Sequence, residues 1–397
     1  MGSVAFCVLL FEGTVRFFVK PSPGCYGVLF QAQLPPFTLR PGDQLFFDYN
    51  HPEGLLGLSR GDLWGIERED PVLGFAPQEE TVSLNSWWQS NNLGARAQED
   101  VTKNIPFGQR RVMIFGDSYT NCSRVPLQMT WPFFLNQESK NITFLNFGVD
   151  GYSMGQCLLR FEIVRKKIDY DMAILVFDPS EDLWRDINVF RQLNGWFNYP
   201  LLPRFVVEHH QLTLVKSPYK DYWDFLRENK DRPSDRFKEH LRAYDRFYFN
   251  SKYEAPSFWG SSVLYKLIAR SVYLSQSARL WKDMWRPDSE AMTVSLGIFD
   301  RFAKDVKQDD RKFVVVLFPT KDDIVNFRND RSFRDRWNKI FFAIEKKGLI
   351  CINLMDGFVN MDPGDLDTGL DGGHYGPHTN KTIEKLLWPK LKVLGLM

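Results

Sequence analysis

The chain has 397 residues, and its 50 Lys and Arg residues balance 49 Asp and Glu residues, so the net charge is +1. This balance argues against a nucleic-acid-binding surface, which would need an excess or a stripe of basic residues. Aromatic residues make up 15% of the chain, which argues against disorder and favours a folded protein with a large core. The length favours two or three domains.

The first segment, residues 1–20, contains the apolar run Val4–Phe11. This run is too short to span a bilayer, which takes about 20 apolar residues. It also lacks the basic region that begins a signal peptide. Two interpretations stay open: a buried strand or helix start, or the tail of a membrane anchor that begins upstream. The second would place the protein outside the cytoplasm or on a membrane, and the first would leave it cytoplasmic.

Residues 21–108 form the second segment, an N-terminal extension in which proline and glycine punctuate short stretches of strand character. Gln44–Asn50, with the sequence QLFFDYN, is predicted to be a short strand. Asn91–Asp100, with the sequence NNLGARAQED, is polar and is predicted to be a loop. No cluster of catalytic residue types is visible in this segment.

The five cysteines are scattered and form no close pair, so neither a disulfide framework nor a thiolate zinc site is expected. A single disulfide stays open. The residues concerned are Cys7, Cys25, Cys122, Cys157 and Cys351.

From residue 109 to the C-terminus, apolar runs of strand length alternate with amphipathic segments. Runs that are apolar on both faces are typical of buried parallel strands. The alternation therefore predicts an α/β sheet with helices on both faces. The predicted strands are Val112–Phe115, Ile142–Phe147, Met172–Phe177, Lys312–Phe318 and Leu349–Leu354. The predicted helices are Met154–Lys167, Ser289–Val306 and Asn380–Val393.

Residues 188–288 interrupt this alternation and are predicted to be an insertion, rich in charged and aromatic residues, that forms a cap over one end of the sheet. Within it, Pro203–Pro218 has the pattern of a hairpin whose turn is His-His-Gln. Aromatic side chains of the insertion could stack on sugars, although such residues more often build a small core of their own.

Ligands of an open parallel sheet bind beyond the carboxyl ends of the strands, so the residues that follow each apolar run are the candidates for chemistry. The first run is followed by Gly116, Asp117 and Ser118. Glycine permits a sharp turn, and free backbone N–H groups at a helix start can hold an anion. On this motif alone, however, a simple helix cap by Asp117 or Ser118 is the favoured interpretation.

The next two strand ends carry weaker signals. The turn Asn146–Gln156 contains three glycines, and a backbone N–H such as that of Gly151 could stabilise an oxyanion. Glycines in turns more often serve backbone geometry alone. The third run is followed by FDPSEDLWRD, which places Ser180 at a strand end and also suits a helix N-cap.

Near the C-terminus, Asp371 and His374 stand three residues apart in a glycine-rich turn before a helix. A histidine that acts as a base needs a partner that fixes its tautomer and stabilises its charged form, and a carboxylate does both. His378 is the competing candidate, but no carboxylate stands at a matching spacing from it.

Taken together and in this order, these blocks resemble the SGNH hydrolases, also called GDSL-like lipases and esterases. GDSYT is similar to the first family block, with Ser118 in the nucleophile position. NFGVDGY is similar to the second, with Gly151 as the oxyanion-hole glycine, and DGGH is similar to the last, with Asp371 and His374. The upstream NNLGARAQED resembles the N-x-G-x-R leader of bacterial members, and Pro203–Pro218 resembles a hairpin insertion of the same group.

One block departs from the family pattern. The family carries an Asn after the third strand whose amide helps to hold the oxyanion, and here Ser180 occupies that position. Loss of one such donor costs about 3–4 kcal/mol of transition-state stabilisation in other hydrolases. Three outcomes follow: Ser180 substitutes for Asn, another donor is recruited, or the enzyme is slow or inactive.

The resemblance implies a flavodoxin-like three-layer α/β/α sandwich with a central parallel sheet over residues 109–397. It also implies ester hydrolysis through an acyl-enzyme on Ser118, with His374 and Asp371 completing a triad and Ser118, Gly151 and Ser180 as oxyanion-hole candidates. No metal or organic cofactor is implied, and the expected partner is a small-molecule or carbohydrate ester, with membrane association if an anchor lies upstream. The alternatives are an envelope polysaccharide O-acyltransferase and a catalytically weak or inactive binding protein.

Overall fold

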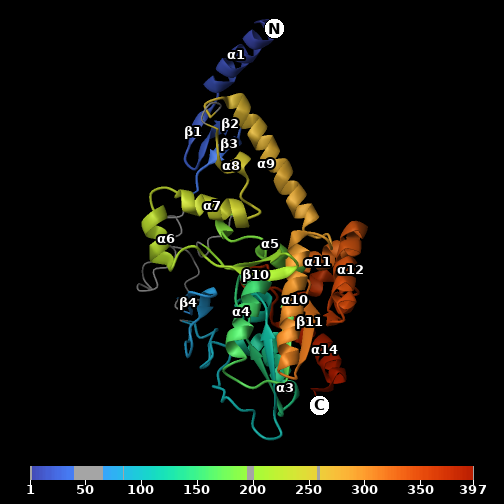
Figure 1. Ribbon diagram of the computed structural model, residues 1–397. Coiled ribbons are helices and arrows are strands. Elements are labelled where there is room, and N and C mark those ends of the chain that lie inside the picture. Colours follow the sequence, from blue (N-terminus) through green and yellow to red (C-terminus); the bar gives the residue numbers. More distant parts are fainter. Residues whose placement is uncertain (1, 40–65, 84, 195–200, 257–259, 397) are drawn as a thin grey trace. The chain divides into compact units, whose positions relative to one another are not determined.

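The computed structural model describes residues 2–39, 66–83, 85–194, 201–256 and 260–396 (Figure 1). The predicted strand Gln44–Asn50 lies outside these residues. The chain divides into two compact units. Unit 1 comprises Met1–Phe46, Asn188–Leu201 and Ser217–Asp283, and unit 2 comprises Phe47–Ile187, Leu202–Lys216 and Met284–Met397.

Unit 2 is built around a five-stranded sheet in the order β12-β11-β8-β6-β7, in which every neighbouring pair is parallel. Each strand coincides with one of the five predicted apolar runs, and β8 is buried along its whole length because all six of its side chains are apolar. The strands are β6 (Arg110–Phe115), β7 (Ile142–Asn146), β8 (Met172–Phe177), β11 (Lys312–Leu317) and β12 (Ile350–Asn353).

Helices cover both faces of this sheet, which confirms the three-layer α/β/α architecture. α4 packs against α10, and α3 packs against α14, in two separate pairs (Figure 1). Two helices between β11 and β12, α11 and α12, were not predicted. The α-helices described in this unit are α2 (Ser118–Asn121), α3 (Trp131–Glu138), α4 (Met154–Val164), α5 (Pro179–Arg185), α10 (Glu290–Gln308), α11 (Lys321–Asn329), α12 (Arg331–Lys346), α13 (Met355–Phe358) and α14 (Pro377–Leu391).

The predicted hairpin is present as β9 (Arg204–Glu208) and β10 (Gln211–Val215), and it belongs to unit 2. Its turn consists of His209 and His210, which both have left-handed backbone conformations with φ of 49° and 62°. Two such residues in succession form the type I′ turn that matches the twist of a two-residue hairpin. Unit 2 also contains the short antiparallel pair β4 (Glu67–Asp70) and β5 (Gly74–Pro77).

Unit 1 joins the N-terminal residues to part of the predicted insertion. Its small core contains Leu29, Leu34 and Val263, with Val15 and Leu267 packed against them. The apolar N-terminal run is part of a helix, and no helix among the described residues is long and apolar enough to cross a membrane. The elements are α1 (Gly2–Phe17), β1 (Lys20–Ser22), β2 (Cys25–Leu29), β3 (Ala32–Phe37), α6 (Tyr222–Asn229), α7 (Asp235–Tyr244), α8 (Asn250–Tyr253) and α9 (Val263–Asp283).

The division into units therefore places the first part of the predicted N-terminal extension with residues 217–283 and the described residues of its later part with the sheet. The boundaries at residues 20 and 108, and a cap formed by the insertion, stay predictions. All five cysteines lie in the described part of the chain, where each is a free thiol.

Candidate active site

After β6, the helix cap and the candidate nucleophile are two different residues. α2 (Ser118–Asn121) starts directly after the strand, and Asp117 is its N-cap, accepting a hydrogen bond from the Tyr119 N–H at 2.9 Å. The second carboxylate oxygen of Asp117 accepts from Arg185 Nη1 at 2.7 Å. Because Asp117 performs the capping, the hydroxyl of Ser118 is left for another partner.

That partner is His374. The Nε2 atom of His374 lies 2.8 Å from Ser118 Oγ, although 256 positions separate the two residues in the chain. The Nδ1 atom of the same ring lies 2.5 Å from Asp371 Oδ2. Asp371 Oδ1 accepts the backbone N–H groups of Gly373 and His374, both at 3.1 Å, which orients the carboxylate toward the ring.

The charges around His374 favour its protonated form. Burial opposes a charge on the ring, but the hydrogen bond to Asp371 and the negative charges of Asp150 and Asp371 outweigh it and raise the pKa of His374. Burial also acts to raise the pKa of Asp371, yet the hydrogen bonds from His374 and Gly373 hold that pKa well below its usual range. An ionised Asp371 therefore accepts from Nδ1–H and leaves Nε2 as the acceptor that faces Ser118.

Arg124 and Asp150 also belong to this site, and the sequence did not point to either. Arg124 Nε donates to Asp371 Oδ2 at 3.0 Å, and its Nη2 lies 3.9 Å from Asp150 Oδ2. Asp150 in turn accepts from Asn121 Nδ2 at 2.8 Å and from Ser123 Oγ at 2.5 Å. These contacts connect the loop after Ser118, the residue before Gly151 and the carboxylate beside His374.

The turn that contains Gly151 packs directly on α2. A Cβ atom on Gly148 would lie 2.5 Å from the backbone nitrogen of Asn121, so only glycine permits this approach. Gly151 itself has φ of 75°, in the left-handed region that favours glycine. Among the described residues, no acceptor takes a hydrogen bond from the N–H of Ser118 or from that of Gly151.

Ser180 has a different partner from the one expected. It lies in α5 (Pro179–Arg185), where Asp178 caps the helix by accepting the Ser180 N–H at 2.9 Å. The Ser180 hydroxyl donates to Asp323 Oδ1 at 2.5 Å. Burial raises the pKa of Asp323 to about 6, despite the hydrogen bonds from Ser180 and Thr320. The single hydroxyl proton of Ser180 is therefore engaged by this carboxylate.

The competing histidine lies apart from this arrangement. His378 is exposed near the start of α14, and its backbone N–H donates to Asp367 Oδ2 at 2.9 Å. Asp367 also accepts the Thr379 N–H at 2.6 Å, so its carboxylate serves the start of the helix.

The predicted polar loop Asn91–Asp100 reaches the back of the site through Arg96. The guanidinium of Arg96 is buried and donates to the carbonyl oxygens of Trp87 at 2.8 Å, Val125 at 2.7 Å and Asn121. Burial lowers the pKa of Arg96 to about 10, partly offset by nearby Cys122 and Asp150. The residue thus holds both ends of the segment 121–125 that follows α2.

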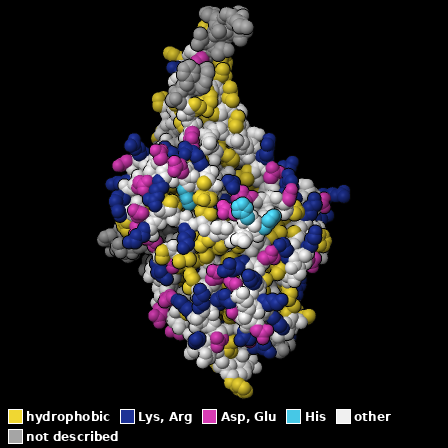
Figure 2. Space-filling view, in the orientation of Figure 1, with side chains coloured by type: hydrophobic (Ala, Val, Ile, Leu, Met, Phe, Trp, Pro, Cys, Tyr) yellow, Lys and Arg dark blue, Asp and Glu magenta, His cyan; other side chains and the backbone are white. Residues whose placement is uncertain are grey.

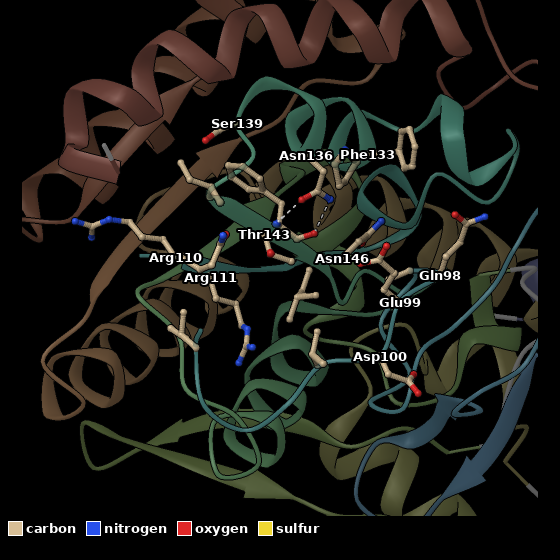
Figure 3. A pocket seen from close by; sticks show the side chains of 18 of the residues that line it. Gln98, Glu99, Asp100, Arg110, Arg111, Phe133, Asn136, Ser139, Thr143 and Asn146 are labelled. Carbon is tan, nitrogen blue, oxygen red and sulfur yellow. Dashed lines mark hydrogen bonds between the residues drawn. The ribbon is translucent and has the colours of Figure 1, made fainter. Parts of the chain in front are cut away.

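A cavity of about 590 Å³ lies at the edge of the sheet along β7. Figure 3 shows side chains that line it. Asn136 covers part of this edge, because its side chain donates to the Phe144 carbonyl at 2.9 Å and accepts the Phe144 N–H at 2.7 Å. None of Ser118, Asp371 and His374 lines the cavity. No group of three or more His, Cys, Asp or Glu side chains in the described part of the chain could hold a metal ion.

No protein-family model matches this sequence, and no curated protein matches it either. Among solved structures, a member of the lipolytic protein G-D-S-L family from Veillonella parvula DSM 2008 is 10% identical over 72% of this chain and 100% of its own, with a TM-score of 0.33. Axe2, an acetylxylan esterase from Geobacillus stearothermophilus, is 11% identical over 75% of this chain and 98% of its own, with a TM-score of 0.34.

The psychrotrophic esterase EstA from Pseudoalteromonas sp. is 10% identical over 72% of this chain and 98% of its own, with a TM-score of 0.35. The chain is thus similar in structure to lipolytic proteins of the GDSL family and to esterases.

Proposed function

We propose that this chain is a serine-dependent hydrolase of carboxylic ester bonds that acts on small acyl esters, with O-acetyl groups of carbohydrates as the substrate class to test first. The observation that carries the proposal is the hydrogen-bonded series from Asp371 through His374 to Ser118, with contacts of 2.5 and 2.8 Å. A hydroxyl next to a base, with the base oriented by a third group, is the arrangement that activates a serine nucleophile.

In the proposed reaction, Ser118 Oγ attacks the ester carbonyl carbon while His374 Nε2 takes the hydroxyl proton. The tetrahedral intermediate collapses, the C–O bond to the alcohol breaks, and His374 returns the proton to the leaving oxygen. Water then attacks the acyl-enzyme, with His374 again accepting a proton and finally restoring it to Ser118. Asp371 stays ionised throughout and stabilises the imidazolium.

The N–H groups of Ser118 and Gly151 are the proposed donors to the oxyanion. Both N–H groups lack an acceptor among the described residues, and the Gly151 turn packs on the helix that starts at Ser118. Ser180 is left out, because its hydroxyl donates to Asp323. A donor aimed at the developing charge is worth about 3–4 kcal/mol in other hydrolases, so each of these two N–H groups would contribute strongly to the rate.

Hydrolysis of an aryl acetate tests the proposal directly. We expect Ser118→Ala and His374→Ala each to lose at least about 10³-fold in kcat, while His378→Ala, which changes an exposed histidine four positions away, keeps wild-type activity. A fluorophosphonate should label Ser118 in the wild type, and peptide mapping would identify the labelled residue. Activity that survives both substitutions would show that the site is assigned wrongly.

The same experiments separate the alternatives. A non-catalytic binding protein would show no labelling of Ser118 and no turnover. An O-acyltransferase would label Ser118 but would release the acyl group faster to an added sugar than to water. If no sugar accelerates release of the acyl group, hydrolysis is the reaction.

A further inference from the structure

Polar contacts fix the second half of α1 to the start of α9 within unit 1. The Glu12 carboxylate accepts the N–H groups of Val263 at 2.6 Å and Leu264 at 2.9 Å, and also the Ser262 hydroxyl at 3.0 Å. Arg16 Nη2 donates to the Ser261 carbonyl at 2.6 Å. A carboxylate that takes the free N–H groups of a helix start acts as a cap. The two charged side chains of α1 therefore hold this helix in a defined position on α9.

Next to this junction, three phenylalanine side chains form an exposed cluster. Phe17 is 90% exposed, Phe18 is 52% exposed and Phe30, in the turn between β2 and β3, is 78% exposed. The ring centroids of Phe17 and Phe18 are 6.3 Å apart, and those of Phe18 and Phe30 are 5.8 Å apart. We name Phe17, Phe18 and Phe30 the aromatic tip. Apolar side chains gather in this part of unit 1 (Figure 2), and contiguous apolar surface of this kind marks an interaction site.

The apolar surface continues along α1 and is not confined to one stripe. Leu10 and Phe11 are consecutive residues of the helix, and both are exposed. Consecutive side chains point about 100° apart on a helix, so the exposed apolar surface of α1 is broad. The acyl chains of a bilayer can contact a broad apolar surface from all sides, because they need no complementary shape.

The charges beside the aromatic tip indicate what kind of surface the tip binds. Between residues 2 and 39 the chain has one acidic residue, Glu12, and its carboxylate is engaged at the start of α9. Two basic side chains in the same range are exposed: Arg16, which contacts Glu12 and Ser261, and Lys20. Basic groups next to apolar anchors are attracted to anionic lipid headgroups.

We infer that α1 and the aromatic tip dock unit 1 on the surface of a bilayer that contains anionic phospholipid. Phe17, Phe18 and Phe30 enter the boundary between headgroups and acyl chains, while Lys20 meets headgroup phosphates. Because Glu12 and Arg16 fix α1 to α9, the docked helix carries unit 1 with it. This inference does not depend on the proposed reaction.

The test is co-sedimentation of the full chain with vesicles of phosphatidylglycerol and phosphatidylcholine in equal parts. We expect the double variant Phe18→Asp/Phe30→Asp to lower the partition coefficient by at least about tenfold, since each change replaces an inserted ring with a charge. Phe107→Asp is the matched control, because Phe107 is a fully exposed phenylalanine of unit 2, and it should partition as the wild type does. Lys20→Glu should weaken binding to these vesicles several-fold and leave binding to pure phosphatidylcholine unchanged.

Circular dichroism and the thermal transition of each variant would show that it is folded. Failure of the wild type to bind these vesicles would overturn the inference. So would equal binding by the wild type and the double variant. A concentration-dependent dimer of the wild type that the double variant abolishes, without vesicle binding by either, would assign the surface to a second copy of the chain instead.

Discussion

The Ser180 hydroxyl donates to Asp323 Oδ1 at 2.5 Å, which joins the residues that follow two neighbouring strands of the sheet, β8 and β11. Asp323 also belongs to a capping box at the start of α11, where Thr320 Oγ1 accepts the Asp323 N–H and the Asp323 carboxylate accepts the Thr320 N–H. Ser180, at the position where the SGNH pattern has Asn, therefore has a structural role. Its one hydroxyl proton cannot be donated to a carboxylate and to an oxyanion at the same time.

The first prediction concerns Ser180→Ala. We expect kcat/KM for an aryl acetate to stay within about threefold of the wild type, because the hydroxyl is not aimed at the oxyanion. The free energy of unfolding should fall by about 1–3 kcal/mol, since the buried Asp323 carboxylate loses a donor. Urea denaturation and steady-state kinetics measure the two effects. A loss of about 10²-fold or more in kcat would instead show that Ser180 supplies an oxyanion donor.

The second prediction concerns pH. His374 has to be neutral to accept the proton of Ser118, and Asp371 and Asp150 raise the pKa of His374 despite burial. Activity is therefore lost as the pH falls through a value above the ordinary histidine pKa of about 6.5. The acid limb of kcat/KM against pH gives this midpoint. Asp150→Asn removes one negative charge and should move the midpoint to lower pH, and a wild-type midpoint at or below about 6.5 would contradict the prediction.

The third prediction concerns Arg124, whose guanidinium contacts Asp371 and approaches Asp150. A positive charge here disfavours a second one on His374, so Arg124→Met should move the acid limb of kcat/KM to higher pH. It should also lower the plateau value by about tenfold, because Asp371 loses one of the groups that orient it. Arg124→Lys keeps the charge and should leave the midpoint in place. If the wild type, Arg124→Met and Arg124→Lys had the same acid-limb midpoint, Arg124 would only contribute to packing.

The fourth prediction concerns Arg96, which binds three carbonyl oxygens around the segment after α2. Arg96→Met should lower the free energy of unfolding by at least about 3 kcal/mol, since hydrogen bonds from a charged donor are lost and buried carbonyls are left without partners. Arg96→Lys should restore part of the loss, because a single ammonium cannot reproduce the guanidinium fork.

Arg110→Met is the control for Arg96, because Arg110 is exposed at the start of β6. Denaturation in urea gives the free energies, and the rate of fluorophosphonate labelling reports on Ser118. A small change in stability for Arg96→Met would show that water replaces the guanidinium.

Local sequence was enough to predict the sheet and the order of its strands along the chain. β8 has the predicted bounds, and the other four strands differ from the predicted runs by one or two residues. Strands that are buried on both faces need unbroken apolar runs, so this pattern is strong. α12 was missed although its buried residues Phe333, Trp337, Ile340 and Ile344 recur at helical spacing, a signal that the sequence already contains.

The sequence by itself also pointed to Ser118, Asp371 and His374, because each lies in a short motif at the end of a predicted element. Only the tertiary structure decided which groups face each other. It placed His374 rather than His378 against Ser118, gave Asp117 the capping role, and paired Ser180 with Asp323, which is 143 positions away. Capping and strand formation depend on neighbours in sequence, whereas these pairings depend on which loops the parallel sheet brings to one edge. For the same reason the roles of Arg96 and Arg124 had no local signal and became visible only in the folded chain.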